Sequence, residues 1–136
     1  MGASEYLEIQ ALGHLLRSST WAKPAGVWLA LLTSLPTDPG GLVEVAAADY
    51  ARIAVGPDDA VWSVRDPDNA HINAAVILFP DPVNDWGQVK GVAFHDASTG
   101  GNQFSWAALA SPKTVSAGGP ALMFAPGAIV VRMNND

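Results

Sequence analysis

Three histidines, His14, His71 and His95, are the side chains of this 136-residue chain best suited to acid–base chemistry or metal binding. They stand far apart in the sequence, and only His95 has a carboxylate beside it, in the pair His95-Asp96. Because adjacent residues of a strand point to opposite faces, this pair would not bring imidazole and carboxylate together. The pattern favours a structural histidine at a hairpin end over a general base or metal ligand.

The carboxylates and hydroxyls occur in turn sequences. Aspartates cluster beside proline or asparagine at Asp58-Asp59, within 66–68 and within 81–85, where aspartate commonly caps its own turn, and none has the ligand spacing of a calcium loop. No serine lies in a Gly-x-Ser-x-Gly turn, and Thr99-Gly100-Gly101 lacks the lysine of a phosphate loop. The sequence therefore predicts no catalytic residue, no cofactor, no metal site and no enzyme.

Composition limits the partners. Thirteen acidic residues against seven basic ones give a net charge of -6, and no basic cluster exists that could follow a phosphate backbone, which argues against nucleic acid. The absence of cysteine excludes disulfides and thiolate sites. Charged residues make up 15% of the chain, below the ~25% typical of soluble proteins, whereas 49% are apolar. We expect part of the apolar surface to be covered by a partner.

No targeting or membrane segment is expected. The start of the chain, 1–6, has neither a basic stretch nor a long apolar core, so it does not resemble a signal peptide. The longest apolar run, 25–32, is far shorter than the ~20 residues of a membrane helix. The sequence predicts a protein that stays in the cytoplasm where it is made.

The elements that hold these residues are mostly short strands. From Ser4 to Arg17, Ile9, Leu12 and Leu16 recur at helical spacing, which predicts one amphipathic helix. Residues 27–33 form a short run that is apolar on both faces, typical of a strand buried on both sides. The further predicted strands are 50–55, 61–64, 72–79, 89–95, 102–109, 121–124 and 128–133, with a hairpin loop at 96–101.

This spacing predicts a mainly β fold, a compact antiparallel β-sandwich or barrel with one short N-terminal α-helix. We interpret residues 1–136 as a single β-rich structural domain, in which 1–20 form an N-terminal helix or arm. No repeat or sustained heptad is visible that could build the shaft of a long fibre.

Five tryptophans are spread over the chain. Trp28 and Trp106 lie within strand patterns and are expected inside, whereas Trp21 and Trp86 adjoin loops and could anchor a neighbouring subunit. Arg52 stands on the wetter face of its predicted strand, where it should reach solvent or a partner. Trp21, Arg52 and Trp86 are therefore the predicted interface residues. Carbohydrate stacking is the competing use of an exposed tryptophan.

Three segments of the chain, taken in order, form a recognisable set. The first is 19–33 with Pro36-Thr37-Asp38, Glu44 and Tyr50-Ala51-Arg52; the second is Asn73-Ala74-Ala75 with Phe79-Pro80 and Asp85-Trp86-Gly87-Gln88-Val89; the third is 91–102 with Pro112-Lys113-Thr114-Val115 and Ala117-Gly118. Together they resemble a family of small tailed-bacteriophage proteins described as tail-fibre or minor tail proteins. The resemblance covers nearly the whole chain and implies a virion component without catalytic residues.

The place in the virion is left open by the sequence. The compact domain favours a capsid decoration or cement protein, which would bind the major capsid protein as a homotrimer at local threefold positions and stabilise the head. The alternative is a tail-fibre or minor tail protein that binds other virion proteins or the host surface. A third hypothesis, a glycan hydrolase, would need a carboxylate pair that the sequence offers only in turns.

Overall fold

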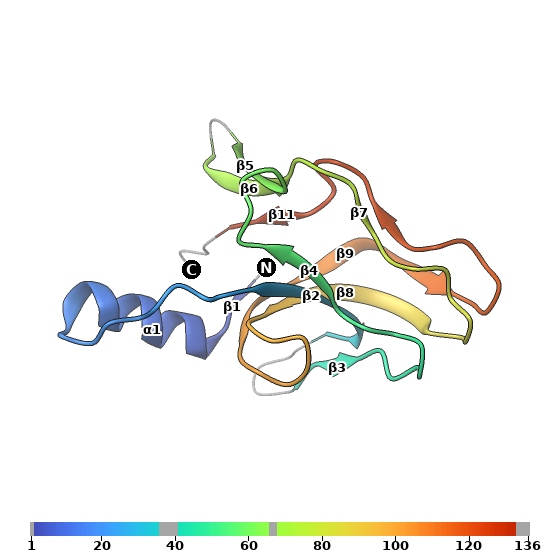
Figure 1. The fold of residues 1–136 in the computed structure, drawn as a ribbon, viewed down its shortest axis with the longest axis horizontal. Coiled ribbons are helices and arrows are strands. Elements are labelled where there is room, and N and C mark those ends of the chain that lie inside the picture. The colour runs from blue at the N-terminus through green and yellow to red at the C-terminus, as the bar shows by residue number, and fades with distance from the viewer. Residues whose placement is uncertain (1, 36–40, 66–67, 133–136) are drawn as a thin grey trace.

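The computed structural model describes residues 2–35, 41–65 and 68–132 as a mainly β fold with one helix in those ranges (Figure 1). This confirms the predicted fold class, and every strand pairing found there is antiparallel. The elements are β1 (Gly2–Ala3), α1 (Glu5–Leu16), β2 (Val27–Ser34), β3 (Val43–Glu44), β4 (Ile53–Gly56), β5 (Trp62–Arg65), β6 (Ala70–Asn73), β7 (Ile77–Leu78), β8 (Gly87–His95), β9 (Gln103–Val115), β10 (Met123–Phe124) and β11 (Val130–Val131).

The largest sheet has the order β1-β9-β8-β2-β3, and β4 also pairs with β2. β2 therefore has β8 along one edge and both β4 and β3 along the other, with β4 opposite 27–29 and β3 opposite 32–34. The predicted hairpin is confirmed as β8 and β9, joined by the loop 96–102. β9 runs on to Val115, six residues past the end expected at Leu109, because its last residues pair with the start of β8.

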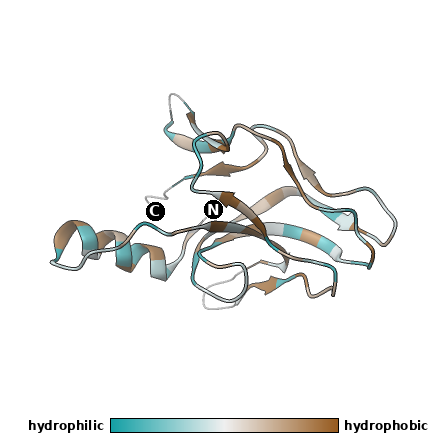
Figure 2. Ribbon diagram, viewed as in Figure 1, coloured by the Kyte–Doolittle hydropathy of each residue, from teal (hydrophilic) through white to brown (hydrophobic). Residues whose placement is uncertain are grey.

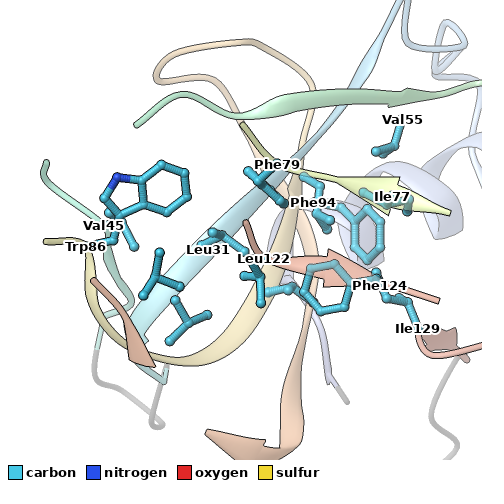
Figure 3. Close-up of a cluster of buried hydrophobic side chains, with 14 of the residues drawn as sticks. Leu31, Val45, Val55, Ile77, Phe79, Trp86, Phe94, Leu122, Phe124 and Ile129 are labelled. Carbon is cyan, nitrogen blue, oxygen red and sulfur yellow. The ribbon is translucent and has the colours of Figure 1, made fainter. Parts of the chain in front are cut away.

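Two small sheets form a second layer over one face of the main sheet: β5-β6-β11 and β7-β10 (Figure 1). The hydrophobic core lies between the layers, where Leu31 and Phe94 of the main sheet meet Ile77, Phe79 and Phe124 (Figure 3). The layers remain open at their edges and do not close into a barrel. The fold is an open sandwich.

The opposite face of the main sheet carries a second, smaller cluster. Ala30, Leu32 and Ala93 have no exposed surface there, and Trp106 packs against them. The expectation that residues 27–33 form a strand is thus confirmed, and its burial on both sides holds for residues 29–32. Trp28 and Trp106, which we expected inside, are only half-buried.

Several predicted strands are wrong in extent. The predicted strand 72–79 is divided into β6 and β7, because the chain leaves the β5-β6-β11 sheet after Asn73 and then pairs with β10. The strand expected at 50–55 begins only at Ile53, and the one expected at 128–133 is reduced to Val130–Val131, with Met133 outside the described residues. β1 and β3 were not predicted.

Asn73 is the polar residue that fixes this division. It is completely buried, and its side-chain amide donates to the carbonyl oxygens of Ala75 and Ala125 at 3.0 and 2.9 Å. Its Oδ1 accepts from the backbone N–H of Ile129 at 2.8 Å. The amide thus bonds one backbone group just after the end of β6 and two in the segment 125–129. A single side chain therefore joins the end of β6 to this segment.

We expect Asn73→Ala to lower the free energy of unfolding by about 2–4 kcal/mol, because it removes three side-chain hydrogen bonds and takes the side-chain partner from the backbone N–H of the buried Ile129. Urea denaturation followed by tryptophan fluorescence measures this. Asn84→Ala is the matched control, because the Asn84 amide also makes a side-chain hydrogen bond but is exposed. An equal loss in the two variants would contradict this role for Asn73.

Candidate interaction surface

Helix α1 is held to the main sheet only at its start. Ser4 caps the helix by accepting a hydrogen bond from the Leu7 backbone N–H at 3.1 Å. The backbone N–H of Ser4 donates to the Phe104 carbonyl at 2.7 Å, and its hydroxyl donates to the Gln103 carbonyl. These bonds and the β1–β9 pairing attach the first turn to β9, and the rest of α1 projects away from the sheets (Figure 1).

The predicted helical stripe exists, but it faces solvent. Ile9, Leu12, Leu15 and Leu16 are 60%, 56%, 75% and 79% exposed, and α1 has no buried residue. Figure 2 shows hydrophobic segments along this projecting helix. At about 100° per residue, Ile9, Leu12 and Leu16 lie within roughly 40° of the direction opposite Leu7, the residue that packs on the core. We call Ile9, Leu12 and Leu16 the α1 ridge.

An apolar groove of about 320 Å³ opens where α1, the β2 start and the β5-β6-β11 sheet meet. Trp21, Trp62, Phe94 and Phe104 are among the residues that line it. Phe94 and Trp62 pack edge to face with ring centroids 5.5 Å apart, and the Trp62 indole N–H donates to the Val55 carbonyl at 2.7 Å. The aromatic walls are therefore held in place by contacts within the chain.

Trp21 lies in this groove. Its ring contacts Tyr6 and Phe104 with centroids 6.5 and 6.2 Å apart, and its backbone N–H donates to Nδ1 of His14 at 3.2 Å. The residue is half-buried. Of the three predicted interface residues, Trp21 alone borders an open apolar surface; its role at an interface stays a prediction.

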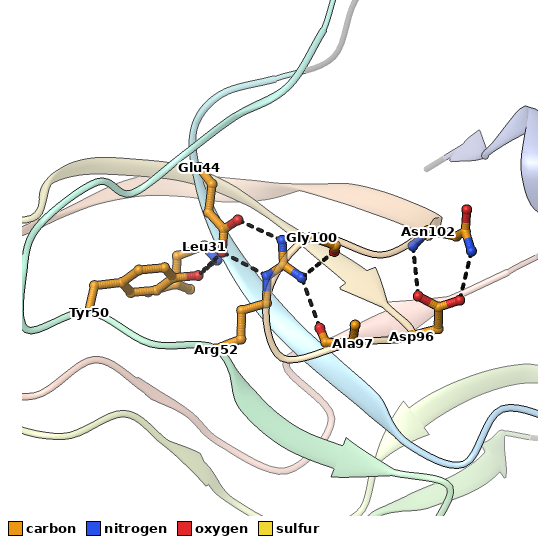
Figure 4. Close-up of polar contacts among 8 residues, drawn as sticks. All are labelled: Leu31, Glu44, Tyr50, Arg52, Asp96, Ala97, Gly100 and Asn102. Atoms are coloured by element: carbon orange, nitrogen blue, oxygen red, sulfur yellow. Dashed lines mark hydrogen bonds and ion pairs between the residues drawn. The ribbon is translucent and has the colours of Figure 1, made fainter.

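Arg52, expected to reach solvent or a partner, has little contact with solvent in this chain, because its side chain is 8% exposed. Its Nη2 and Nε bind the two carboxylate oxygens of Glu44 at 2.9 and 3.0 Å, while Nη1 donates to the carbonyls of Ala97 and Gly100 at 2.9 and 2.8 Å (Figure 4). The Tyr50 hydroxyl donates to Glu44 at 2.6 Å. The guanidinium thus joins β3 to the 96–102 hairpin loop, and its interface role remains untested.

The electrostatics of this network keep Glu44 charged. Burial raises the pKa of Glu44, but hydrogen bonds from Arg52 and Tyr50 outweigh it and hold that pKa below its ordinary value. Burial and the Glu44 carboxylate both raise the pKa of Tyr50, so its hydroxyl stays protonated. The network is a closed set of charge-assisted hydrogen bonds.

Trp86 is a core residue. It is 4% exposed, lies edge to face against Tyr50 and Phe79, and donates from its indole N–H to Asp49 at 3.1 Å. Asp49 also accepts from the backbone N–H groups of Val83 and Asn84 at 2.7 and 3.3 Å. The loop position that suggested an interface is correct, but the indole is turned inward, so little of it is left for a partner.

His95 ends β8, where the sequence placed it, and is 5% exposed. Burial lowers its pKa, and the nearby Arg52 charge lowers it further. Its Nδ1 has no hydrogen-bond partner among the described residues. The neighbouring Asp96 carboxylate is taken up by Asn102, whose backbone and side-chain N–H groups donate to it at 2.7 and 2.9 Å. His95 and Asp96 therefore do not form a catalytic pair.

The other carboxylates also hold turns. Asp58 accepts from the Ala60 N–H at 2.8 Å as its turn sequence predicts, while Asp85 accepts from the Ala117 N–H at 2.8 Å. Asp68 pairs with Arg65. Asp66 of the same predicted loop lies outside the described residues. Within the described ranges, no three histidine, aspartate or glutamate side chains gather in a way that could hold a metal ion.

The described part of the chain also has no helix long and apolar enough to cross a membrane. The described residues thus form a β-rich module that exposes an apolar helix ridge and carries an aromatic groove. Compared with known families, residues 2–132 match the podophage GP4 fiber I protein gp80. The chain belongs to this family, which makes it a structural protein of a bacteriophage virion. No curated protein matches it.

Arg52→Lys should loosen the 96–102 loop, because an ammonium cannot make the forked contact with Glu44 and both loop carbonyls at once. We expect a loss of about 1–3 kcal/mol in unfolding free energy and faster amide hydrogen exchange in the loop. Arg65→Lys, which alters an exposed pair, is the control. Unchanged exchange in the loop would show that Arg52 does not hold it.

We expect the hydrogen bonds of Asp49 to make part of the free energy of unfolding depend on pH in the acid range. Despite its desolvation, which raises the value, the hydrogen bonds from Val83, Asn84 and Trp86 lower the pKa of Asp49 from 3.8 to about 2. Because the pKa of Asp49 is lower in the folded than in the unfolded chain, the ionised carboxylate contributes fully to the free energy of unfolding above pH ~4. This contribution is lost as the pH falls towards 2. Asp49→Asn should therefore lower the urea midpoint at neutral pH and flatten its decline in acid. Asp59→Asn is the control, and an unaltered pH profile in Asp49→Asn would contradict the assignment.

Proposed function

We propose that this chain is a non-catalytic component of a podophage fibre that works by docking onto other virion proteins. The observation that carries the proposal is the α1 ridge, whose large aliphatic side chains point away from the body of the chain. Fully burying one such side chain is worth about 1.5–3 kcal/mol, so covering the exposed part of Ile9, Leu12 and Leu16 would contribute roughly 3–6 kcal/mol.

The helix itself supports docking. A 12-residue helix is marginal in water by itself, and α1 carries Gly13 in its interior and packs only its first turn on the core. Covering the ridge would stabilise the helix as well as the contact. The exposed apolar surface therefore favours a partner over a free monomer.

The engaged carboxylates argue against the glycan hydrolase hypothesis. A glycosidase needs two carboxylates on either side of an open site. Here the acidic side chains that come close to other elements accept hydrogen bonds from turns, loops or arginines, as Glu44, Asp49, Asp58, Asp68, Asp85 and Asp96 do.

The fibre location is supported by the description of the matching family as a fiber protein. A second candidate, a capsid decoration protein bound to the major capsid protein, is supported by the compact open sandwich, which has no repeating shaft in the described residues. In either place the chain would act in the assembled virion, through protein contacts and without nucleic acid or membrane.

The copy number of this chain in purified particles separates the two locations. We expect a handful of copies per virion, because a fibre component is attached only at the tail. Quantitative mass spectrometry against the major capsid protein, with a tail protein of low copy number as the internal control, measures the ratio. Hundreds of copies would refute the fibre location and establish the decoration protein.

A further inference from the structure

We propose that the α1 ridge of one copy inserts into the aromatic groove of a second copy, so that the chain assembles with itself in a head-to-tail manner. This inference rests on the proposed function, that the chain works by docking, and it names the partner. Two separate features of the same chain carry it: a convex apolar surface and a concave one, neither of which is filled within the described residues.

The groove suits aliphatic side chains. Its lining includes four aromatic rings, and the main polar group among the remaining lining residues is the imidazole of His71. A cavity of about 150 Å³ is sufficient to bind benzene, so about 320 Å³ leaves room for roughly two groups of that size, such as two leucine side chains. Among the residues that the structure describes, no carboxylate or ammonium lines the groove to oppose an apolar guest.

The ridge cannot fill the groove of its own chain. Leu7 lines the groove, and Ile9, Leu12 and Leu16 lie on the opposite side of the same helix. A rigid α1 therefore directs its ridge outward while its inner side borders the groove. Only another molecule can bring the two surfaces together.

Charge favours one orientation of the guest helix. Glu5 and Glu8 stand in the first turn of α1 beside the ridge. At the groove, the exposed Lys23 precedes Pro24 of the lining, and His71 lines the groove and is itself exposed. An incoming α1 can therefore place its acidic turn against Lys23 and His71, whereas the net charge of -6 would otherwise keep two copies apart.

The alternative arrangement, ridge against ridge, leaves the groove empty on both copies. Insertion of ridge into groove covers both surfaces and is heterologous, because each copy contributes a different patch to the contact. Such contacts close into a ring or continue as an open chain. A ring of three would be the homotrimer that we expect from the sequence.

The decisive experiment is complementation between two variants of the full-length chain. Leu12→Asp with Leu16→Asp damages the ridge and leaves the groove intact; Val131→Asp places a carboxylate in the groove and leaves the ridge intact. Sedimentation velocity at tens of micromolar should show an oligomer for the unaltered chain and association weakened at least roughly tenfold for each variant. Mixing the two variants should restore a one-to-one pair, because one sound ridge then meets one sound groove.

Three results would overturn the proposal: a monomeric unaltered chain, an unchanged oligomer in the groove variant, which indicates ridge-to-ridge pairing, or a mixture that stays monomeric. Thermal unfolding checks that each variant is folded, and His71→Asp, at an exposed rim position, replaces Val131→Asp if that variant is unfolded. Val76→Asp, an exposed valine away from both surfaces, is the control. A negative complementation result would refute the contact between copies and would not bear on the fibre location. Hundreds of copies per virion would refute the fibre location and would not bear on this contact.

Discussion

The pairing of β2 with β8 is the interaction on which the rest of the structure depends. Five consecutive residues of β2, from Trp28 to Leu32, pair with the end of β8, and the other edge of β2 receives β4 and β3. Leu29 and Leu31 face the core between the layers, while Ala30 and Leu32 face the second cluster. Since both faces and both edges of β2 are occupied, this strand positions the neighbouring strands and the second layer. Its first residue, Val27, also lines the groove.

The part of the fold that the sequence could predict is the part with long hydrophobic patterns. The helix, β2, the β8–β9 hairpin and the mainly β class follow from local periodicity and turn residues. β1 and β3 could not be predicted, because strands of two residues are defined by their partners; β1 pairs with β9 about a hundred positions away. The break after Asn73 depends on carbonyls that only the folded chain brings to its amide.

The candidate site shows the same limit. Alternation placed Arg52 on the wetter face of a strand, and it could not show that a carboxylate eight positions earlier and two loop carbonyls would enclose the guanidinium. The nearest signal was the set Glu44, Tyr50 and Arg52, three groups able to form one network. Likewise, residues that carried the family resemblance, among them Asn73 and Trp86, hold loops and core together. They identify the family through its architecture and not through chemistry.

The route by which α1 joins the sheet has a mechanical consequence. Residues 17–26 lead from the helix directly into the start of β2, which lies between β8 on one side and β4 and β3 on the other. A pull on α1 is therefore directed along the axis of the central strand, and it loads the hydrogen bonds to β8 together, in shear, instead of opening them one after another. At the other end of the helix, β1 is tied to β9 by its own ladder and by Ser4. A module attached by this helix would resist tension through its most deeply buried strand.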